Sequence, residues 1–190
     1  MMIKIEKLEK LDEKELYLIF ESFISKWSRM IRPCDFENFY RLYKELDQTE
    51  YVYGVFDQDK LAGVFGLSGS FVEPIPKIKK SCALKNWRWH LGVKLLGESV
   101  HPNECYLSFI AVAKEYRGKG IGQICLAFIE EFAMGQSDIN TVSLMVAVDN
   151  KKALALYKNR GFKVIGQLNS WLTRGILGER SWLKMVKEVD

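Results

Sequence analysis

The alternation of apolar and polar positions divides the chain into short strands and amphipathic helices. Alternation over Met2–Lys7 predicts a first strand, and Tyr51–Phe56 and Leu61–Leu67 flank a polar DQDK turn, which is typical of an antiparallel hairpin. Between them, helical spacing predicts two helices, the first capped by Asp12 and the second starting at Pro33. Their apolar positions are Leu16, Ile19, Phe20, Phe23, Ile24 and Trp27, then Phe36, Phe39, Tyr40, Tyr43 and Leu46.

The second half of the chain repeats this mixture of strands and helices. An apolar strand over Cys105–Ala113 leads through a glycine-rich loop into a helix whose apolar positions keep a spacing of three and four residues. A compact strand, Thr141–Val148, precedes a helix that ends at Gly161, where a left-handed cap is expected. The last two strands are predicted at Phe162–Leu168 and Ser181–Val186. This order of elements predicts a mixed α/β domain, and no linker divides residues 1–190 into two domains.

Residues Ser68–Asn103 give a weaker pattern. A proline-containing loop precedes the basic run Lys77–Lys80, which is typical of a solvated face. Long connections of this kind often cover a binding site, so we interpret 68–103 as an inserted lid or acceptor-side segment. One helix face within it carries Leu84, Trp87, Leu91 and Leu95, with Gly92 weakening the helix.

Composition narrows the classes of partner. The net charge of +4 is spread over the 190 residues without a long basic block, which argues against nucleic acid as a partner but suits a polyanionic small molecule. The N-terminus lacks an apolar signal core, and the longest uncharged apolar run, Leu61–Val72, is too short to cross a bilayer. We therefore expect a cytoplasmic protein that acts away from membranes. The four cysteines form no CxxC pair and indicate a reducing compartment.

The stretch Glu104–Gly122 carries the candidate chemistry. A strand feeds a glycine-rich turn that opens a helix, and free backbone N–H groups at a helix start bind phosphates. A P-loop is excluded because no Lys-Ser or Lys-Thr follows a glycine at the required spacing. A dinucleotide motif is excluded as well, since Gln123 or Cys125 stands where its third glycine would be.

What remains is the sequence R-x-x-G-x-G, from Arg117 to Gly122. It resembles the acyl-CoA-binding loop of the GCN5-related N-acetyltransferase (GNAT) family. A second block, VDNKKALALYKNRGF from Val148 to Phe162, resembles that family's N-x-x-A-x-x-L-Y-x-x-x-G-F signature. Both blocks occur in the family's order with one strand between them, and the resemblance covers about Glu104 to Gly166.

The resemblance implies a fold and a cosubstrate. The fold is a mixed, mostly antiparallel sheet of about six to seven strands flanked by helices, with splayed central strands that admit the pantetheine arm of acetyl-CoA. The pyrophosphate rests on the loop amides, with charge-assisted contacts from Arg117 and Lys119. The cofactor-binding residues expected from this are Ile110, Ala111, Val112, Arg117, Gly118, Lys119, Gly120, Ile121, Gly122 and Asn150.

Two residues are candidates for the acid–base chemistry of acyl transfer. In the ribosomal-protein N-acetyltransferase branch of the family a glutamate at the start of the central strand is the base, and its spacing to the loop matches that from Glu104 to Arg117. Tyr157 stands at the family's tyrosine position, where a phenol protonates the leaving thiolate or donates a hydrogen bond to it. The structural alternatives are a solvated glutamate and a core aromatic residue.

Other readings stay open beside this one. Cys105 could carry an acyl group, but it alternates to the strand face opposite Glu104, and with only His90 and His101 in the chain neither a Cys–His pair nor a metal site is expected. The predicted function is direct transfer of an acetyl group to a primary amine of a small molecule or peptide. The alternative is a non-catalytic acyl-CoA-binding regulatory module. The identity of the amine stays open, and either a monomer or a homodimer is compatible with the sequence.

Overall fold

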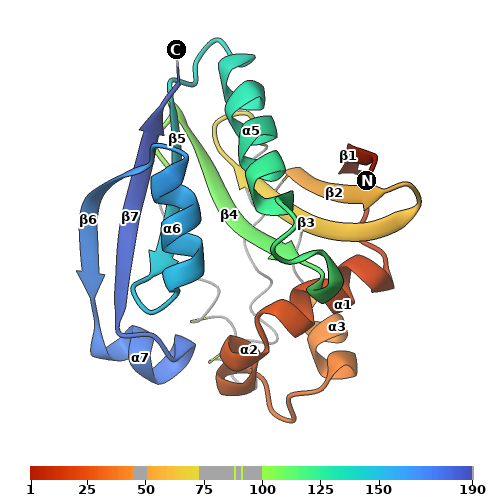
Figure 1. The fold of residues 1–190 in the computed structure, drawn as a ribbon. Coiled ribbons are helices and arrows are strands. Elements are labelled where there is room, and N and C mark those ends of the chain that lie inside the picture. Colours follow the sequence, from red (N-terminus) through yellow and green to blue (C-terminus); the bar gives the residue numbers. More distant parts are fainter. Residues whose placement is uncertain (45–50, 73–87, 89–90, 92–99, 190) are drawn as a thin grey trace.

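The computed structural model describes residues 1–44, 51–72, 88, 91 and 100–189, which form one sheet with helices on both faces (Figure 1). Its strands are β1 (Ile3–Leu8), β2 (Tyr51–Asp57), β3 (Lys60–Ser68), β4 (Glu104–Val112), β5 (Thr141–Ala147), β6 (Lys163–Asn169) and β7 (Ser181–Glu188). Its helices are α1 (Glu13–Ser22), α2 (Ile24–Met30), α3 (Phe36–Lys44), the short 3-10 helix η2 (Lys114–Tyr116), α5 (Ile121–Met134), α6 (Lys151–Asn159) and α7 (Trp171–Leu177).

The seven strands follow the order β1-β2-β3-β4-β5-β7-β6. Among the described residues, β4 and β5 make the parallel pairing and the other neighbours are antiparallel, so the predicted mostly antiparallel sheet is confirmed. The pairing of β4 with β5 runs from Glu104 with Thr141 to Leu107 with Leu144, and then it stops. The two central strands therefore separate over their second halves, as the resemblance implied.

A bulge in β4 marks the point of separation. On the β3 side, Gly66 pairs with Phe109 and Leu67 pairs with Leu107, so Ser108 is an extra residue in β4. A bulge bends its strand and increases the local twist. Because it falls where the pairing with β5 ends, this bend directs the second half of β4 away from β5.

The helices near the N-terminus differ from the prediction in their limits. The first helix follows Asp12 as expected, and the carboxylate of Glu15 accepts a hydrogen bond from the Asp12 amide at 3.0 Å. It breaks at Phe23 into α1 and α2, although no glycine or proline stands there. The next helix begins at Phe36 rather than Pro33, because Asp35 accepts a hydrogen bond from the Asn38 amide at 2.8 Å and is the better cap.

The C-terminal half agrees with the predicted strands and adds one helix. The connection between β6 and β7 contains α7, which the sequence pattern did not predict. Ser170 caps it by accepting from the amides of Leu172 and Thr173, and Gly178 ends it in the left-handed conformation. Of the inserted segment, residues 73–87, 89–90 and 92–99 lie outside the described residues, as do Leu46 and Cys82, so the predicted lid stays a prediction.

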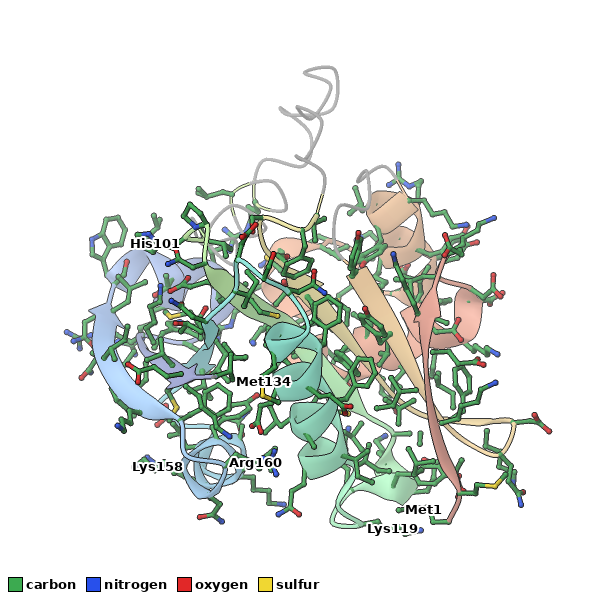
Figure 2. All side chains as sticks on the ribbon, turned by 90° about the horizontal axis from the view of Figure 1, so that it is seen from above. Met1, His101, Lys119, Met134, Lys158 and Arg160 are labelled. Atoms are coloured by element: carbon green, nitrogen blue, oxygen red, sulfur yellow. The ribbon has the colours of Figure 1, made fainter. Side chains whose placement is uncertain are left out.

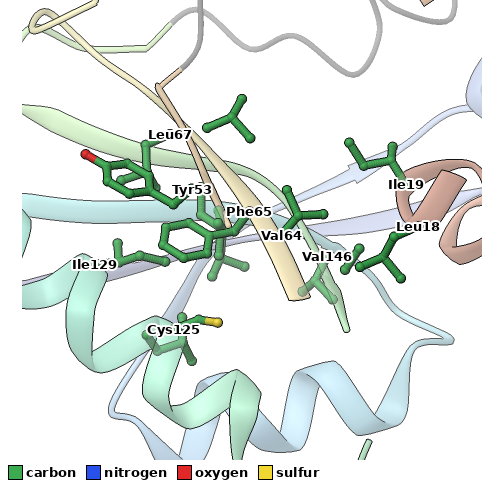
Figure 3. Packing of buried hydrophobic residues seen from close by; sticks show 14 of the residues in the cluster. Leu18, Ile19, Tyr53, Val64, Phe65, Leu67, Cys125, Ile129 and Val146 are labelled. Atoms are coloured by element: carbon green, nitrogen blue, oxygen red, sulfur yellow. The ribbon is translucent and has the colours of Figure 1, made fainter. Parts of the chain in front are cut away.

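The core fills both faces of the sheet. Phe65 of β3 points to α5, where its ring centroid lies 5.9 Å from that of Phe128, and it stacks on Tyr53 at 5.2 Å. Figure 3 shows Ile129 of α5 on this side, whereas the neighbouring Val64 points to the side of α1. Burying these apolar side chains holds α5 and α1 against opposite faces of the sheet.

A charged cluster fixes α6 against α5. The carboxylate of Glu130 in α5 is buried and pairs with the guanidinium of Arg160 at the end of α6. Lys187 of β7 contacts the same carboxylate at 2.9 Å. Since α5 follows the glycine loop and α6 carries Asn150 at its cap and Tyr157 in its second turn, this cluster holds the two halves of the candidate site together.

Candidate functional site

The glycine-rich loop before α5 has the backbone of an anion site. Gly118 and Gly120 have φ angles of 77° and 84°, which an L side chain rarely adopts, and a Cβ at either would meet nothing within 4 Å. Among the described residues, the amides of Gly118, Gly120, Ile121 and Gly122 donate to no backbone carbonyl. These donors stand at the positive end of a 14-residue helix and are open to an anionic ligand.

Two members of the predicted loop also have packing roles. The Ile121 side chain is 1% exposed and belongs to the core, so only its amide faces the loop. A Cβ at Gly122 would lie 2.8 Å from Cδ2 of Leu156 in α6. The missing side chain at Gly122 therefore allows α5 and α6 to approach each other, in addition to leaving its amide open.

The two cations of the loop are held differently. The Nε of Arg117 donates to the carbonyl of Val112 at 3.0 Å and so ties the loop to the end of β4. Lys119 is exposed, with its Nζ 5.3 Å from the centroid of the Tyr116 ring, and Figure 2 labels it at the rim of the molecule. Arg117 thus has a structural contact, and Lys119 is the more available cation for a phosphate.

A cavity of about 190 Å³ lies where β4 and β5 separate. Of the strand residues expected to contact pantetheine, Ile110 lines it, whereas Ala111 and Val112 do not, and the Val112 carbonyl is already bonded to Arg117. Asn150 and Tyr157 line one part of the cavity. The other lining residues are Phe23, Lys26, Tyr106, Leu107, Ser108, Phe109, Leu144, Met145, Val146, Ala147, Ala153, Leu168, Thr173, Leu177 and Trp182.

The α6 residues of the site are fixed by ordinary helix contacts. The Oδ1 of Asn150 accepts from the Ala153 amide at 3.2 Å and caps the helix. Tyr157 is 5% exposed and its ring packs 5.9 Å from that of Phe162. Burial, with a smaller contribution from Cys125, raises the pKa of the Tyr157 phenol to about 12. The phenol is therefore a neutral hydrogen-bond donor at physiological pH.

Comparison with known proteins places this geometry in a family. The family model described as the acetyltransferase (GNAT) family matches residues 16–162, which is more than half of the chain. The chain belongs to the GNAT family. The family prediction is confirmed, and GNAT membership accounts for the separated strands and the glycine loop together.

Relatives and structural neighbours of this GNAT chain share its fold at modest identity. It is 38% identical over 77 residues to the N-alpha-acetyltransferase RimI of Mycobacterium tuberculosis, covering 40% of this chain and 46% of that protein. It is 26% identical to the acetyltransferase PseH of Campylobacter jejuni, with 86% of both chains covered. A Bacillus subtilis acetyltransferase solved in complex with CoA superposes with a TM-score of 0.67 at 17% identity over the whole of both chains.

The match to the first of these relatives is partial in length. The chain spans less than half of the Mycobacterium tuberculosis protein, and a second curated relative, from Mycobacterium leprae, is matched over 20% of its length. The comparison therefore shows the GNAT family and fold, while the activity and acceptor of this chain are matters for proposal.

Glu104 lies outside the cavity of this GNAT domain. It is 9% exposed at the start of β4, with Oε1 3.4 Å from Nζ of Lys184 and Oε2 3.4 Å from the amide of His101. Tyr106, two residues farther along the same strand face, lines the cavity instead. The structure thus brings Tyr157 to the cavity and leaves Glu104 one strand repeat away from it.

The sequence reasoning missed the side of the cavity opposite α6. Phe23 stands at the break before α2 and Lys26 lies within α2. Thr173 and Leu177 come from α7, and Trp182 comes from β7. In the first predicted helix Lys26 stands between the apolar positions Ile24 and Trp27, so its partial burial could have been inferred from the sequence. Ser170 and Gly178 are likewise recognisable helix caps for α7.

One described residue of the insertion connects the two helices on this side. Arg88 donates from Nε to the carbonyl of Arg29 in α2 at 2.9 Å and from Nη2 to that of Gly175 in α7 at 3.2 Å. These two helices also pack directly against each other. Arg88 therefore helps to fix the spacing of two helices that line the cavity.

Two negative findings apply to the described part of the chain. No group of three His, Cys, Asp or Glu side chains there could hold a metal ion. No helix there is long and apolar enough to span a membrane. Cys105 is buried, and burial raises the pKa of its thiol to about 12, which leaves it a poor nucleophile at neutral pH.

Proposed function

We propose that the protein is an acetyl-CoA-dependent N-acetyltransferase that transfers the acetyl group directly from the thioester to a primary amine. The observation that carries this proposal is the cavity between β4 and β5. It is lined by Asn150 and Tyr157 of the α6 side and by Lys26 and Trp182 of the opposite side. Two reactants entering from opposite sides can therefore meet within one cavity, which is what direct transfer requires.

The residues of the loop fit the phosphate end of acetyl-CoA. The unbonded amides at Gly118, Gly120, Ile121 and Gly122 supply donors, and the absence of side chains at Gly118 and Gly120 allows phosphate oxygens to approach. Lys119 adds a cation at the rim, and Asn150 and Ile110 line the cavity that the acyl end would enter. When bound, acetyl-CoA supplies an acetyl group activated as a thioester.

Tyr157 supplies a hydrogen-bond donor at the cavity. Its phenol stays protonated because burial raises its pKa to about 12. A free thiol has a pKa of about 8.5. This is roughly three pKa units below that of the phenol, so complete proton transfer from the phenol to a thiolate is unfavourable. Tyr157 therefore acts by donating a hydrogen bond to the departing sulfur, which stabilises its developing negative charge.

Glu104 is the proposed base and acts through a relay. Its carboxylate does not line the cavity, which disfavours direct contact with the amine. Ser143 of β5 pairs in the register with Tyr106, which lines the cavity, and its hydroxyl is fully buried without a hydrogen-bond partner among the described residues. A hydroxyl can accept and donate at once, so Ser143 and a water could carry the proton from the amine to Glu104.

The second candidate is a regulatory module that binds acyl-CoA without turnover. Calorimetry with CoA and a chromatographic assay of CoA release across a panel of amines separate the two functions. The enzyme is supported by CoA formation that depends on an amine and yields its acetylated product. Tight CoA binding with no product from any amine would favour the regulatory module.

A further inference from the structure

The side of the cavity formed by α2, α7 and β7 contains one charged side chain among its described lining residues. That side chain is Lys26, and the remaining lining residues are apolar, aromatic or neutral polar. No aspartate or glutamate lines the cavity in the described part of the chain. Any acceptor that enters here therefore meets a positive charge in a cavity whose other described lining residues are uncharged.

Lys26 is partly buried, and the part of the chain that the structure describes gives it no close counter-ion. Its Nζ lies 4.8 Å from the centroid of the Trp182 ring and 5.1 Å from that of Phe23. Within the described residues no carboxylate lies within 4 Å of it, and Glu179 acts only from a greater distance. Burial lowers the pKa of Lys26, which means that this surrounding disfavours its charge.

A purely structural role explains this lysine poorly. The aromatic rings compensate part of the lost hydration through cation–π contacts, but a methionine would fill the same space without any desolvation penalty. A partly buried charge that weakens the fold is typical of a position with a binding role. The missing counter-ion would then be part of a ligand.

The carboxylate of Glu104 does not offset the positive charge of Lys26. Glu104 is already paired with Lys184 at 3.4 Å. Polyamines and aminoglycosides carry several positive charges and need carboxylates along their binding site. Lys26 would repel them, whereas it would attract the acidic group of an amine that also carries a negative charge.

We propose that Lys26 binds the acidic group of the acceptor, and that the acceptor is a small amine carrying a carboxylate or a phosphate. This inference rests on the proposed acetyl transfer and narrows its substrate class. Lys26 adds no chemical step to the reaction. It orients the acceptor by a charge-assisted hydrogen bond at one end while the amine faces the thioester at the other.

The kinetic test uses pairs of amines that differ in the acidic group. L-methionine is compared with L-methioninamide, and O-phosphoethanolamine with ethanolamine, while spermidine represents polycations. Lys26→Met is expected to lower kcat/KM for the anionic member of the preferred pair by about 10–100-fold, and for its neutral partner by less than about threefold. Lys26→Arg keeps the charge and should retain most of the preference. The pair with the larger drop identifies the acidic group.

A structural role would give a different pattern. Lys26→Met is expected to leave CoA affinity unchanged and to maintain or raise the melting temperature, because it removes a poorly compensated charge. If wild type and Lys26→Met discriminate equally between the members of both pairs, or if spermidine is the best acceptor, the inference is overturned.

Direct binding separates this inference from the proposed activity. Calorimetry with the same compounds, with and without CoA, measures how tightly each one binds at the Lys26 subsite when no turnover occurs. Tighter binding of the anionic member to wild type that is lost in Lys26→Met supports the subsite, even if no amine is acetylated and the enzyme proposal fails. Equal affinities for both members, or no binding of either, overturn the subsite.

Discussion

Replacing Tyr157 by phenylalanine tests the proposed mechanism most directly. The substitution removes one hydroxyl from a side chain that lines the cavity and is 5% exposed. Among the described residues this hydroxyl makes no hydrogen bond, so its removal leaves no protein group unpaired. The ring packing against Phe162 is kept. We therefore expect the unfolding free energy to change by less than about 1 kcal/mol, or below about 4 °C in melting temperature.

The expected loss of activity follows from the hydrogen bond to sulfur. A hydrogen bond to a charged group contributes about 1.5–3 kcal/mol, which corresponds to a roughly 10–150-fold decrease in kcat. CoA affinity should change little, because the bond strengthens only as negative charge develops on the sulfur. Turnover is followed by chromatographic measurement of released CoA, and CoA binding by calorimetry.

Tyr53 provides a matched control for this substitution. It is also buried, burial likewise raises its pKa to about 12, and its ring packs on Phe65, but it does not line the cavity. Tyr53→Phe should therefore leave kcat unchanged. If Tyr157→Phe turns over as fast as wild type, Tyr157 has only a packing role. An equal loss in both variants would point to a general effect of core tyrosines.

Further predictions concern the loop, the base and the buried thiol. Gly120→Glu should weaken CoA binding by more than about 100-fold, because it places a carboxylate in the anion site. It also forces a residue with a side chain into the left-handed conformation, which costs about 1–2 kcal/mol of conformational energy. A variant that keeps its circular dichroism spectrum and still binds CoA would contradict the loop assignment. Glu104→Gln should shift the acidic limb of the pH–rate profile, and an unchanged limb excludes Glu104 as the base. Cys105→Ala should keep turnover, since direct transfer needs no thiol, and abolished turnover in a folded variant would support a covalent step. Burial raises the pKa of Cys105 to about 12, above its value in the unfolded chain, so the stability from its neutral thiol is present below about pH 8.5 and falls as pH rises toward 12. Urea unfolding at pH 7 and pH 10 should show a smaller alkaline loss for Cys105→Ala.

The local features of the glycine-rich loop and of α6 were accessible from the sequence. Gly118 and Gly120 stand where left-handed backbone is required, and Asn150 and Gly161 cap α6 at its two ends. Such features depend on residues close together in the chain, so they can be read from a short window. The position of Tyr157 follows from the same helix.

The limits of elements set by distant contacts were not accessible. The break at Phe23 has no local signal, and it divides one predicted helix into α1 and α2. Trp27 then packs against Phe39 of α3, with ring centroids 5.1 Å apart. The gain from this packing depends on a helix that follows later in the chain, so a periodicity analysis cannot detect it.

The fold also gives two predicted site residues contacts that their spacing did not indicate. Glu104 had the right spacing to the loop, but its ion pair with Lys184 joins residues 80 positions apart and lies outside the cavity. Val112 was expected to pair with pantetheine, and this stays a prediction, but the fold adds a hydrogen bond from Arg117 to its carbonyl. Spacing along a strand gives the face of a residue, whereas its partners come from other strands.

The sequence by itself determined the GNAT family, the order of strands and helices, and the loop that suits phosphates, because these depend on neighbouring residues and their periodicity. Only the tertiary structure decided which side chains share the cavity. Lys26 and Trp182 lie more than 150 residues apart in the chain, yet the Lys26 Nζ is 4.8 Å from the centroid of the Trp182 ring. Their contact arises where α2 and β7 meet at the separated strands. That meeting depends on packing across the sheet, and it places a cation where the acceptor is proposed to bind.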